Sequence, residues 1–270
     1  MTTPLVSVVI PTFHRESDVV RAACSALDQT GVTLEVIVLD DSAENSAQSH
    51  VTSIVDKRLR YERCTTASGG VPARVRNRGL GLARGEFLHF LDDDDTLLPG
   101  ALEALSTALV ASPASGVAFG VVEPVGDDTG VLAKEQVYFA SAAARLRRLT
   151  SRRDLCAALL FTTTPLVNSA CMVRREVAGA IGGYAEDIAR CEDAEFYLRA
   201  IRASGCRFVD REVVRYQTGR PSLMHSLEDD VLINVSYHLL HERYRREHGA
   251  LEYLGLRLLA WTWPTQRRER

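Results

Sequence analysis

The feature that most constrains how this chain can fold is the alternation of short apolar runs with helix-forming segments in its first half. The runs at 5–10, 34–39 and 86–91 are rich in Val, Ile, Leu and Phe, which predicts strands. Longer segments with helical patterning separate them. Strands that alternate with helices in this way predict an α/β fold with a mostly parallel central sheet flanked by helices.

Polar residues follow three of the predicted strands at the point where each strand ends. They occupy 12–15, 40–41 and 92–95. Ligands of open parallel sheets bind beyond the carboxyl ends of the strands. We therefore expect these three segments to meet at one edge of the sheet and to form a binding site there.

Four consecutive aspartates, Asp92 to Asp95, are the most unusual of these polar segments. Carboxylates this close repel one another and raise one another's pKa unless a cation is nearby. A divalent ion would relieve the repulsion, and oxygen ligands suit Mg²⁺ or Mn²⁺. A solvated acidic loop before the helix expected after Pro99 would explain the same residues. From this segment alone both interpretations stay open.

Composition excludes several classes of protein. With 270 residues and 46% hydrophobic content, the chain can bury the core of one large domain or of two lobes. A net charge of −3 gives no electrostatic reason to expect nucleic acid as a partner. The six cysteines form no C-x-x-C pair, so no zinc or redox motif is indicated. No segment reads as a signal peptide or a transmembrane helix, so we expect a cytoplasmic protein, in solution or peripheral at the membrane.

Five blocks of sequence are, taken together, similar to one known family. In chain order they are 6–13, 35–42, 76–80, 83–95, and 182–184 with 192–193. The fourth block ends in a D-x-D segment, and the last combines Gly-Gly-Tyr with Glu-Asp. In this order the sequence resembles the family 2 glycosyltransferases of the GT-A fold. The resemblance implies a Rossmann-like, mostly parallel sheet of GT-A type, a mixed acceptor-binding half and C-terminal helices.

The resemblance implies a metal-dependent, inverting hexosyltransferase that takes its sugar from a nucleotide-diphosphate sugar. UDP is the expected nucleotide, although GDP and dTDP donors occur in the family. A bound Mn²⁺ or Mg²⁺ would bridge the diphosphate, with Asp94 as its direct ligand and Asp92 assisting. The residues implied to contact the nucleotide are Pro11, Thr12, Phe13, Asp40, Asp41, Arg76, Asn77, Asp92 and Asp93.

Asp193 is implied to be the catalytic base, and the neighbouring Glu192 to orient it or to touch the acceptor. Asp193 would take the proton from the acceptor hydroxyl as that oxygen attacks the anomeric carbon opposite the diphosphate. One displacement inverts the configuration, so no covalent sugar intermediate is needed. An acidic first helical turn favoured by the helix dipole is the alternative interpretation of this pair.

The same resemblance divides the chain into three functional parts. Residues 1–115 are the nucleotide-sugar-binding half, 116–225 the acceptor-binding and catalytic half, and 226–270 a C-terminal helical extension. The acceptor could be a glycan, a lipid-linked glycan or a small molecule, and loop residues from 122 to 153 are expected to shape that choice. Arg220 and His225 either belong to a loop that closes over the diphosphate or lie on the surface.

The C-terminal segment combines Trp261 and Trp263 with a basic end, Arg267, Arg268 and Arg270. Aromatic residues beside arginines occur in helices that lie in a membrane interface, which would suit a lipid-linked acceptor. A helix packed on the body of the protein with a frayed basic tail is the alternative.

Two other functions compete with glycosyl transfer. A nucleotidyltransferase would share the nucleotide-binding sheet and the metal, but the segment 11–16 lacks the glycines of its phosphate loop. A catalytically inactive protein that binds nucleotide or glycan is the other alternative, and the presence of Asp94 and Asp193 argues against it. A dehydrogenase is disfavoured because the chain has no G-x-G-x-x-G after a predicted strand.

Overall fold

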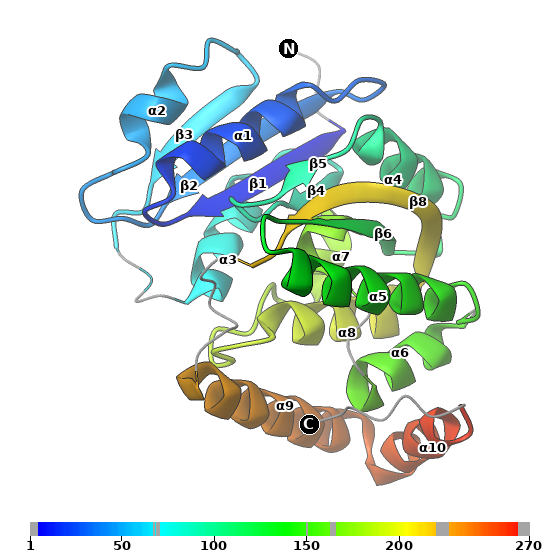
Figure 1. Ribbon diagram of the computed structural model, residues 1–270. Coiled ribbons are helices and arrows are strands. Elements are labelled where there is room, and N and C mark those ends of the chain that lie inside the picture. The colour runs from blue at the N-terminus through cyan, green and yellow to red at the C-terminus, as the bar shows by residue number, and fades with distance from the viewer. Residues whose placement is uncertain are drawn as a thin grey trace.

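The computed structural model describes residues 5–66, 68, 71–149, 151–162, 166–219 and 227–263, apart from the side chains of 227–230. The described part is built on an eight-stranded sheet in the order β3-β2-β1-β4-β7-β6-β8-β5 (Figure 1). Helices flank this sheet, which confirms the predicted α/β class.

The first half of the sheet is parallel, as predicted. β1 (Val6–Thr12) lies between β2 (Leu34–Asp40) and β4 (Phe87–Phe90), and β3 (Leu59–Arg63) lies outside β2. β2 is buried along its whole length because helices cover both faces, which explains its continuous apolar run. The helices of this half are α1 (Glu16–Leu27), α2 (Gln48–Thr52), α3 (Pro72–Leu82) and α4 (Ala101–Val110).

The second half of the sheet mixes strand directions. β7 (Cys171–Arg174) pairs antiparallel with β4 and with β6 (Val117–Val125). β8 (Cys206–Gln217) runs parallel to β6, and β5 (Thr96–Leu97) pairs antiparallel with β8 at the edge. Strands from before and after residue 115 thus belong to one sheet. The division of the chain into functional parts at 115 and 225 stays a prediction. The other helices are α5 (Thr129–Leu146), α6 (Arg152–Phe161), η1 (Asn168–Ala170), α7 (Arg175–Ala180), α8 (Glu192–Ser204), α9 (Leu227–His248) and α10 (Ala250–Trp261).

Two apolar layers, one on each face of the sheet, hold the helices in place. Alternate residues of β1 point to opposite faces, as strand geometry requires. Val9 belongs to the layer that contains Phe196 of α8, whereas Val8 belongs to the layer that contains Val19 of α1 and Leu105 of α4. The first layer also includes residues of α9 and α10, so these two C-terminal helices share a core with α8.

The segment 122–153, which we expected to be a loop, is mostly helix. α5 occupies its centre, and Asp128 caps the helix by accepting hydrogen bonds from the N–H groups of Gly130 and Val131 at 2.8 and 2.9 Å. The prediction was wrong because Gly126 and Gly130 were read as a turn, whereas the Ala-rich run that follows favours helix. The centre of this segment is therefore a regular helix.

A capping box opens α6, as predicted. Ser151 Oγ accepts the N–H of Asp154 at 3.1 Å, and Asp154 Oδ2 accepts the N–H of Ser151 at 3.0 Å. A second predicted box, at Ser226, lies outside the described residues. α9 and α10 form the end of the molecule opposite α2 and β3 (Figure 1). Among the helices described, none has the length and apolar character to cross a membrane.

Candidate active site

The carboxyl ends of β1 and β2 and the segment after β4 meet at one edge of the sheet. The register of the parallel pair sets Thr12 beside Asp40. The Thr12 hydroxyl donates to Asp93 Oδ2 at 2.7 Å, which ties the end of β1 to the acidic run Asp92–Asp95. The three polar segments of the sequence therefore contribute to one site.

Arg15 supplies a positive charge to the acidic run. Its guanidinium pairs with Asp94 and lies 3.3 Å from Asp93 Oδ1. Burial raises the pKa of Asp93 to about 7, although Arg15 and the Thr12 hydroxyl act in the opposite direction. Burial also raises the pKa of Asp94, again opposed by Arg15. These carboxylates are poorly solvated, so a further cation would stabilise their charged forms.

Arg76 of α3 joins the acidic run to the first turn of α8. Its side chain is buried, Nη2 lies 2.7 Å from Asp92 Oδ1, and Nη1 pairs with Glu192. The guanidinium also lies 5.5 Å from the ring centre of Tyr184, a cation–π contact. We call this arrangement the Arg76 bridge. One cation thus holds Asp92, from the predicted donor half, together with Glu192, from the predicted catalytic helix.

Asp193 lies in the first turn of α8, beside Glu192, and is partly exposed. Its Oδ1 accepts the N–H of Ala194 at 2.7 Å. Desolvation raises the pKa of Asp193 to about 7; the charge of Glu192 adds to the rise, and Arg76 opposes it. A carboxyl group that titrates near neutral pH is suited to accept a proton from a bound molecule.

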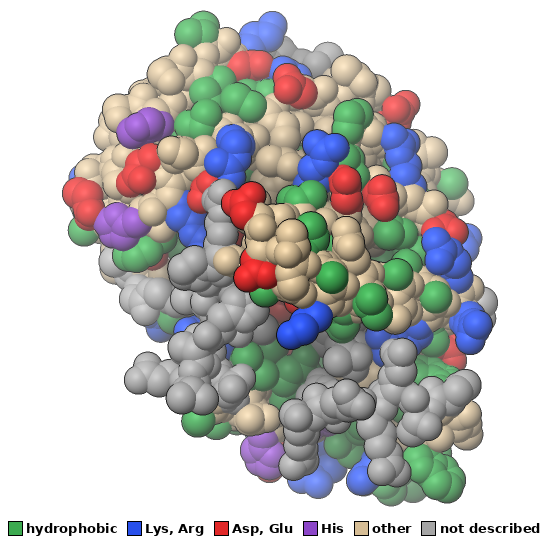
Figure 2. All heavy atoms as spheres, in the orientation of Figure 1, with side chains coloured by type: hydrophobic (Ala, Val, Ile, Leu, Met, Phe, Trp, Pro, Cys, Tyr) green, Lys and Arg blue, Asp and Glu red, His purple; other side chains and the backbone are tan. Residues whose placement is uncertain are grey.

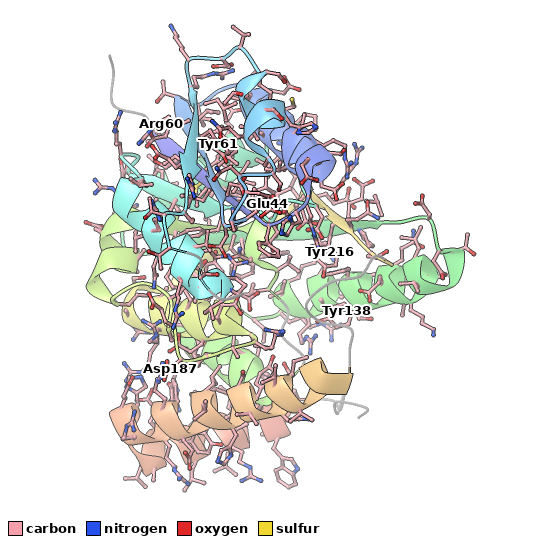
Figure 3. All side chains as sticks on the ribbon, turned by 90° about the vertical axis from the view of Figure 1, so that its left-hand side faces the viewer. Glu44, Arg60, Tyr61, Tyr138, Asp187 and Tyr216 are labelled. Carbon is pink, nitrogen blue, oxygen red and sulfur yellow. The ribbon has the colours of Figure 1, made fainter. Side chains whose placement is uncertain are left out.

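The two aspartates at the end of β2 have different surroundings. Asp40 is fully buried, and its oxygens accept four hydrogen bonds of 2.6 to 3.0 Å. Figure 3 labels Tyr61 of β3, whose hydroxyl is one of the donors. The donors are the N–H and hydroxyl of Ser42, the N–H of Ala47 and the hydroxyl of Tyr61. No acceptor site is left on Asp40 for a nucleoside. The carboxylate of Asp41 accepts the N–H and the hydroxyl of Ser68 at 2.9 and 2.5 Å, fewer strong hydrogen bonds than Asp40 receives, so it retains acceptor capacity.

Asn77 holds the turn that contains Gly183 and Tyr184. Its Oδ1 accepts the N–H of Tyr184 at 2.7 Å, and its Nδ2 donates to the Tyr184 carbonyl and to Glu186, both at 3.0 Å. Gly183 adopts a φ of +73°, and a Cβ there would lie 2.4 Å from Asn77 Oδ1, so the turn requires glycine. These contacts use both N–H groups of the Asn77 amide and one lone pair of its Oδ1, so the side chain is held against the turn.

Pro11 and Phe13 flank Thr12 at the end of β1. The Phe13 ring is 57% exposed and packs edge-on against His14, with 4.2 Å between ring centres. An exposed aromatic ring offers an apolar face on which a planar base can stack. Pro11 is partly buried. That these residues border the nucleoside stays a prediction from the resemblance.

Two buried polar residues of η1 were missed by the sequence analysis. Ser169 Oγ accepts the N–H of Asp92 at 3.0 Å. Asn168 Nδ2 lies 3.3 Å from Asp92 Oδ1, and its own Oδ1 accepts the Tyr184 hydroxyl at 2.9 Å. An isolated Asn-Ser pair in an irregular segment carries no pattern. Only the pairing of β7 with β4 brings it beside the acidic run.

Asp95 differs from the other three aspartates because it contacts the end of β8. It is 1% exposed, and its Oδ1 accepts the N–H of Gln217 at 3.0 Å, which ties the acidic run to the end of β8. Burial and the neighbouring carboxylates raise the pKa of Asp95 well above its ordinary value.

Some predicted residues lie outside the described part of the chain: Arg220, His225, Arg267, Arg268 and Arg270. Within the described ranges, no three His, Cys, Asp or Glu side chains already converge as a complete metal site.

Comparison with known proteins gives a family match over most of the chain. The model of the glycosyl transferase family 2 matches residues 7–182. An uncharacterized protein of Mycobacterium tuberculosis, MT1568, is 30% identical over 220 residues, covering 78% of this chain and 66% of that protein. A GalNAc(5)-diNAcBac-PP-undecaprenol beta-1,3-glucosyltransferase of Campylobacter jejuni is 40% identical over 104 residues. That alignment covers 38% of this chain and 33% of the relative, so the chain matches only part of these proteins.

A solved structure shows the same fold. The crystal structure of S. aureus TarS 1-349 in complex with UDP is similar with a TM-score of 0.61 and 18% identity. The similarity covers 94% of this chain and 69% of that one. It therefore supports the GT-A arrangement of the sheet and its helices.

Proposed function

Because this chain belongs to glycosyl transferase family 2, a nucleotide-sugar-dependent family, we propose that it transfers a sugar from a UDP-sugar to an acceptor hydroxyl with inversion. The observation that carries the proposal is the Arg76 bridge, since it holds Asp92 beside the catalytic helix that bears Asp193. The UDP bound by TarS and the glucosyl transfer named for the Campylobacter relative support the choice of reaction and nucleotide. The nucleotidyltransferase alternative has no such support.

For the donor, we assign nucleoside contacts to the residues at the end of β1 and to Asp41. Phe13 offers a ring for the base, and Asp41 keeps lone pairs for a base or ribose donor. Asp93, near Thr12, is the candidate for the ribose. Asp40 and Asn77 act indirectly in this proposal, because their hydrogen-bonding groups are used to hold the loop after β2 and the Gly183 turn.

The acidic run fits a divalent cation. Its carboxylates are partly buried and have raised pKa values at Asp93 and Asp94, so added positive charge would stabilise them. A complete protein cage is not required, since Mg²⁺ sites commonly use one or two carboxylates together with substrate phosphates and water. We propose that Asp94, with Asp92, holds Mn²⁺ or Mg²⁺. When bound, this ion would neutralise charge on the diphosphate leaving group.

Asp193 is proposed as the general base. It takes the proton of the acceptor hydroxyl while that oxygen attacks the anomeric carbon, and the sugar–phosphate bond breaks on the opposite face. Its pKa of about 7 allows the carboxylate form at neutral pH while keeping it basic enough to accept the proton. Glu192 positions α8 through the Arg76 bridge, since its carboxylate is buried and paired.

The acceptor class proposed is a glycan, including a lipid-linked glycan. The relative from Campylobacter is named for an undecaprenol-linked acceptor, which favours this class over small molecules. Within the proposed acceptor half, residues 116–225, the segment expected to select the acceptor contains the helix α5 (Figure 1).

A thermal-shift panel tests the donor assignment. The protein is heated with UDP, GDP, dTDP, NAD or ATP, each with Mn²⁺ and with EDTA. A ligand at one hundred times its dissociation constant stabilises the fold by about 2.7 kcal/mol, which is readily measured. We expect a shift with UDP and Mn²⁺ that EDTA removes. No shift with any diphosphate, or a shift with NAD alone, would contradict the proposal and favour a binding protein without transferase activity.

Asp94→Ala is the matched variant for that panel. It should lose the Mn²⁺-dependent part of the UDP shift, because the proposed direct ligand is gone. Asp210→Ala is the control, since Asp210 is exposed and pairs with Arg147 on another part of the surface. An unchanged Mn²⁺ effect in Asp94→Ala would remove Asp94 as the ligand.

A further inference from the structure

α10 presents an apolar face that no described residue covers. Leu251, Leu254, Leu258 and Trp261 recur at helical spacing and are 89, 49, 63 and 79% exposed. The opposite face packs on the body through Leu256, which is 1% exposed. We call these four residues the α10 stripe. Figure 2 shows hydrophobic side chains gathered at the lower right, where α10 lies in Figure 1.

The two faces of α10 have different surroundings. Trp263 packs against the apolar layer beneath, whereas Trp261 points outward. The helix is therefore docked on the body, and its apolar stripe is not covered by any other part of the chain that the structure describes. Exposed apolar patches of this kind mark surfaces that bind another molecule or a membrane.

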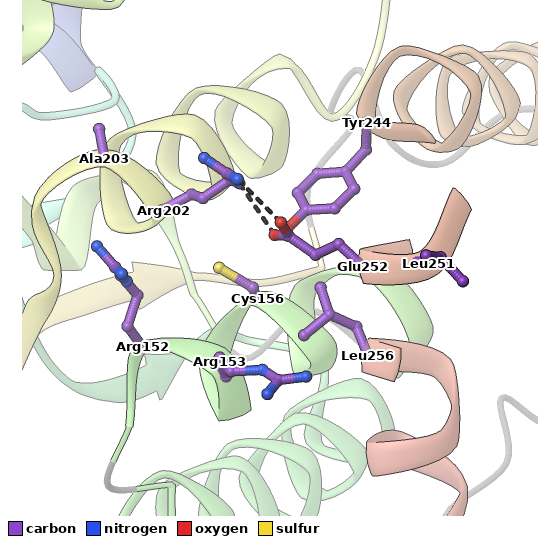
Figure 4. Close-up of a pocket in the computed structure, with 9 residues that line it drawn as sticks. All are labelled: Arg152, Arg153, Cys156, Arg202, Ala203, Tyr244, Leu251, Glu252 and Leu256. Carbon is purple, nitrogen blue, oxygen red and sulfur yellow. Dashed lines mark hydrogen bonds and ion pairs between the residues drawn. The ribbon is translucent and has the colours of Figure 1, made fainter. Parts of the chain in front are cut away.

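A basic pocket borders the α10 stripe. Its volume is about 650 Å³, and it lies between α6, α8, α9 and α10 (Figure 4). Arg202 in this pocket is neutralised by Glu252 at 3.0 Å. Arg152 and Arg153, at the start of α6, are exposed and form no ion pair within the described part of the chain. Leu251 of the stripe lines the same pocket, so the unpaired arginines and the apolar face adjoin.

We propose that the α10 stripe and this pocket dock the protein on an anionic membrane surface. The stripe would enter the boundary between headgroups and acyl chains, and Arg152 and Arg153 would bind lipid phosphates. A helix with one apolar face and basic flanks lies in the plane of the interface in this way. Guanidinium groups match phosphate oxygens through paired N–H groups.

The charge around the stripe identifies a lipid surface as the occupant. Arg257 is exposed on the flank of the stripe and has no ion pair among the described residues. In sequence the chain continues with Arg267, Arg268 and Arg270. A basic residue near an anionic membrane strengthens binding by about fivefold. A second copy of the same basic surface would instead bring like charges together.

This inference goes beyond sugar transfer and does not depend on it, because vesicle binding needs neither donor nor acceptor. The full chain is incubated with vesicles of phosphatidylcholine alone or with 30% phosphatidylglycerol, and bound protein is measured by cosedimentation. We expect binding to the anionic vesicles that falls strongly at high salt. Equal recovery in the supernatant with both vesicles would overturn the proposal.

Matched variants separate the stripe from nonspecific attraction. Leu254→Glu with Leu258→Glu should weaken binding at least tenfold, and so should Arg152→Glu with Arg153→Glu. Val137→Glu is the control, because Val137 is 69% exposed on α5, away from the stripe. All these side chains are exposed, so the melting temperature and UDP-dependent shift should not change. Binding of the stripe variants equal to that of the wild type would overturn the assignment.

Tryptophan fluorescence gives a second readout of the same contact. The chain has two tryptophans, so Trp263→Phe leaves Trp261 as the sole reporter. A blue shift on addition of anionic vesicles is expected, since Trp261 would leave water. Sedimentation velocity tests the competing occupant: a dimer that the Leu254→Glu, Leu258→Glu variant dissolves would assign the stripe to self-association and reject the membrane.

Discussion

At the scale of single residues, Asp40 and Asp193 show what the sequence can and cannot predict. Asp40 ends β2, and Asp193 lies in the first turn of α8. The resemblance to family 2 glycosyltransferases implies that Asp40 contacts the nucleotide and that Asp193 is the catalytic base. Asp40 accepts four hydrogen bonds, from Ser42, Ala47 and Tyr61. The carboxylate of Asp193 accepts the N–H of Ala194, and desolvation raises its pKa. The sequence predicts that both residues lie at the ends of secondary-structure elements. It does not predict their hydrogen-bond partners, because a partner such as Tyr61 belongs to a different strand.

Asp193→Asn tests the proposed base. Transfer should fall by about 10²–10⁴-fold, because a positioned base contributes that much, while the UDP-dependent thermal shift is retained. Asp187→Asn is the control, because Asp187 is an exposed partner of Arg243 and touches no proposed reacting group. Turnover of Asp193→Asn at the wild-type rate would show that another group takes the proton.

The pKa of Asp193 predicts a pH dependence for both rate and stability. kcat/KM should rise with pH through about 7 as the base ionises, and this step should vanish in Asp193→Asn. Because the folded-state pKa lies above its unfolded value, the group's contribution to stability is present below about 4 and is lost as pH rises through about 7. The melting temperature of Asp193→Asn relative to wild type should therefore increase from pH 5 to pH 8, and a constant difference would contradict the raised pKa.

At the scale of elements, strands were easier to predict than the pieces between them. The buried strands β1, β2 and β4 are predominantly apolar because helices cover both their faces. A loop was expected at 122–153, but α5 occupies its centre. The expectation relied on two glycines, whereas the 18 residues of α5 include many that favour a helix. η1 could not be predicted, since its shape depends on its place between β7 and the acidic run.

The turn before α8 offers a matched pair of glycines. Gly182 and Gly183 have φ values of +78° and +73°, but only at Gly183 would a Cβ meet Asn77. Gly182→Ala should cost about 1–2 kcal/mol for the left-handed conformation alone. Gly183→Ala should cost more and should also lower the transfer rate, because Asn77 and the turn must move. Equal losses of stability by denaturant titration would show that Asn77 does not fix the turn.

The Arg76 bridge couples α3 to α8 and is testable as a buried ion pair. Arg76→Gln leaves Asp92 and Glu192 without their shared cation, and the free energy of unfolding should fall by about 3–5 kcal/mol. Adding Glu192→Gln should restore part of it, since one uncompensated carboxylate is removed. Arg202→Gln is the control: its pair with Glu252 is about one-third exposed and should contribute at most about 1 kcal/mol. Similar losses for both arginines would contradict the bridge.

At the scale of the whole molecule, one sheet carries both halves of the proposed reaction. The parallel part was predicted from periodicity, and β7, β6 and β8 extend it so that η1 and α8 approach the same edge. That extension was not predictable, because the antiparallel pairing of β7 with β4 depends on contacts between residues about 85 positions apart. The edge at which we propose catalysis therefore depends on this pairing as well as on the acidic motif.

The central claim is that the donor and the base share this edge, and a crystal structure with UDP and Mn²⁺ tests it most directly. Anomalous scattering should give one Mn²⁺ peak close enough to the Asp94 carboxylate for direct coordination. The uracil should stack against Phe13, and Asp193 should face the open side of the diphosphate. A manganese peak or a nucleotide bound away from Asp92–Asp94, or Asp193 turned away from that edge, would contradict the account.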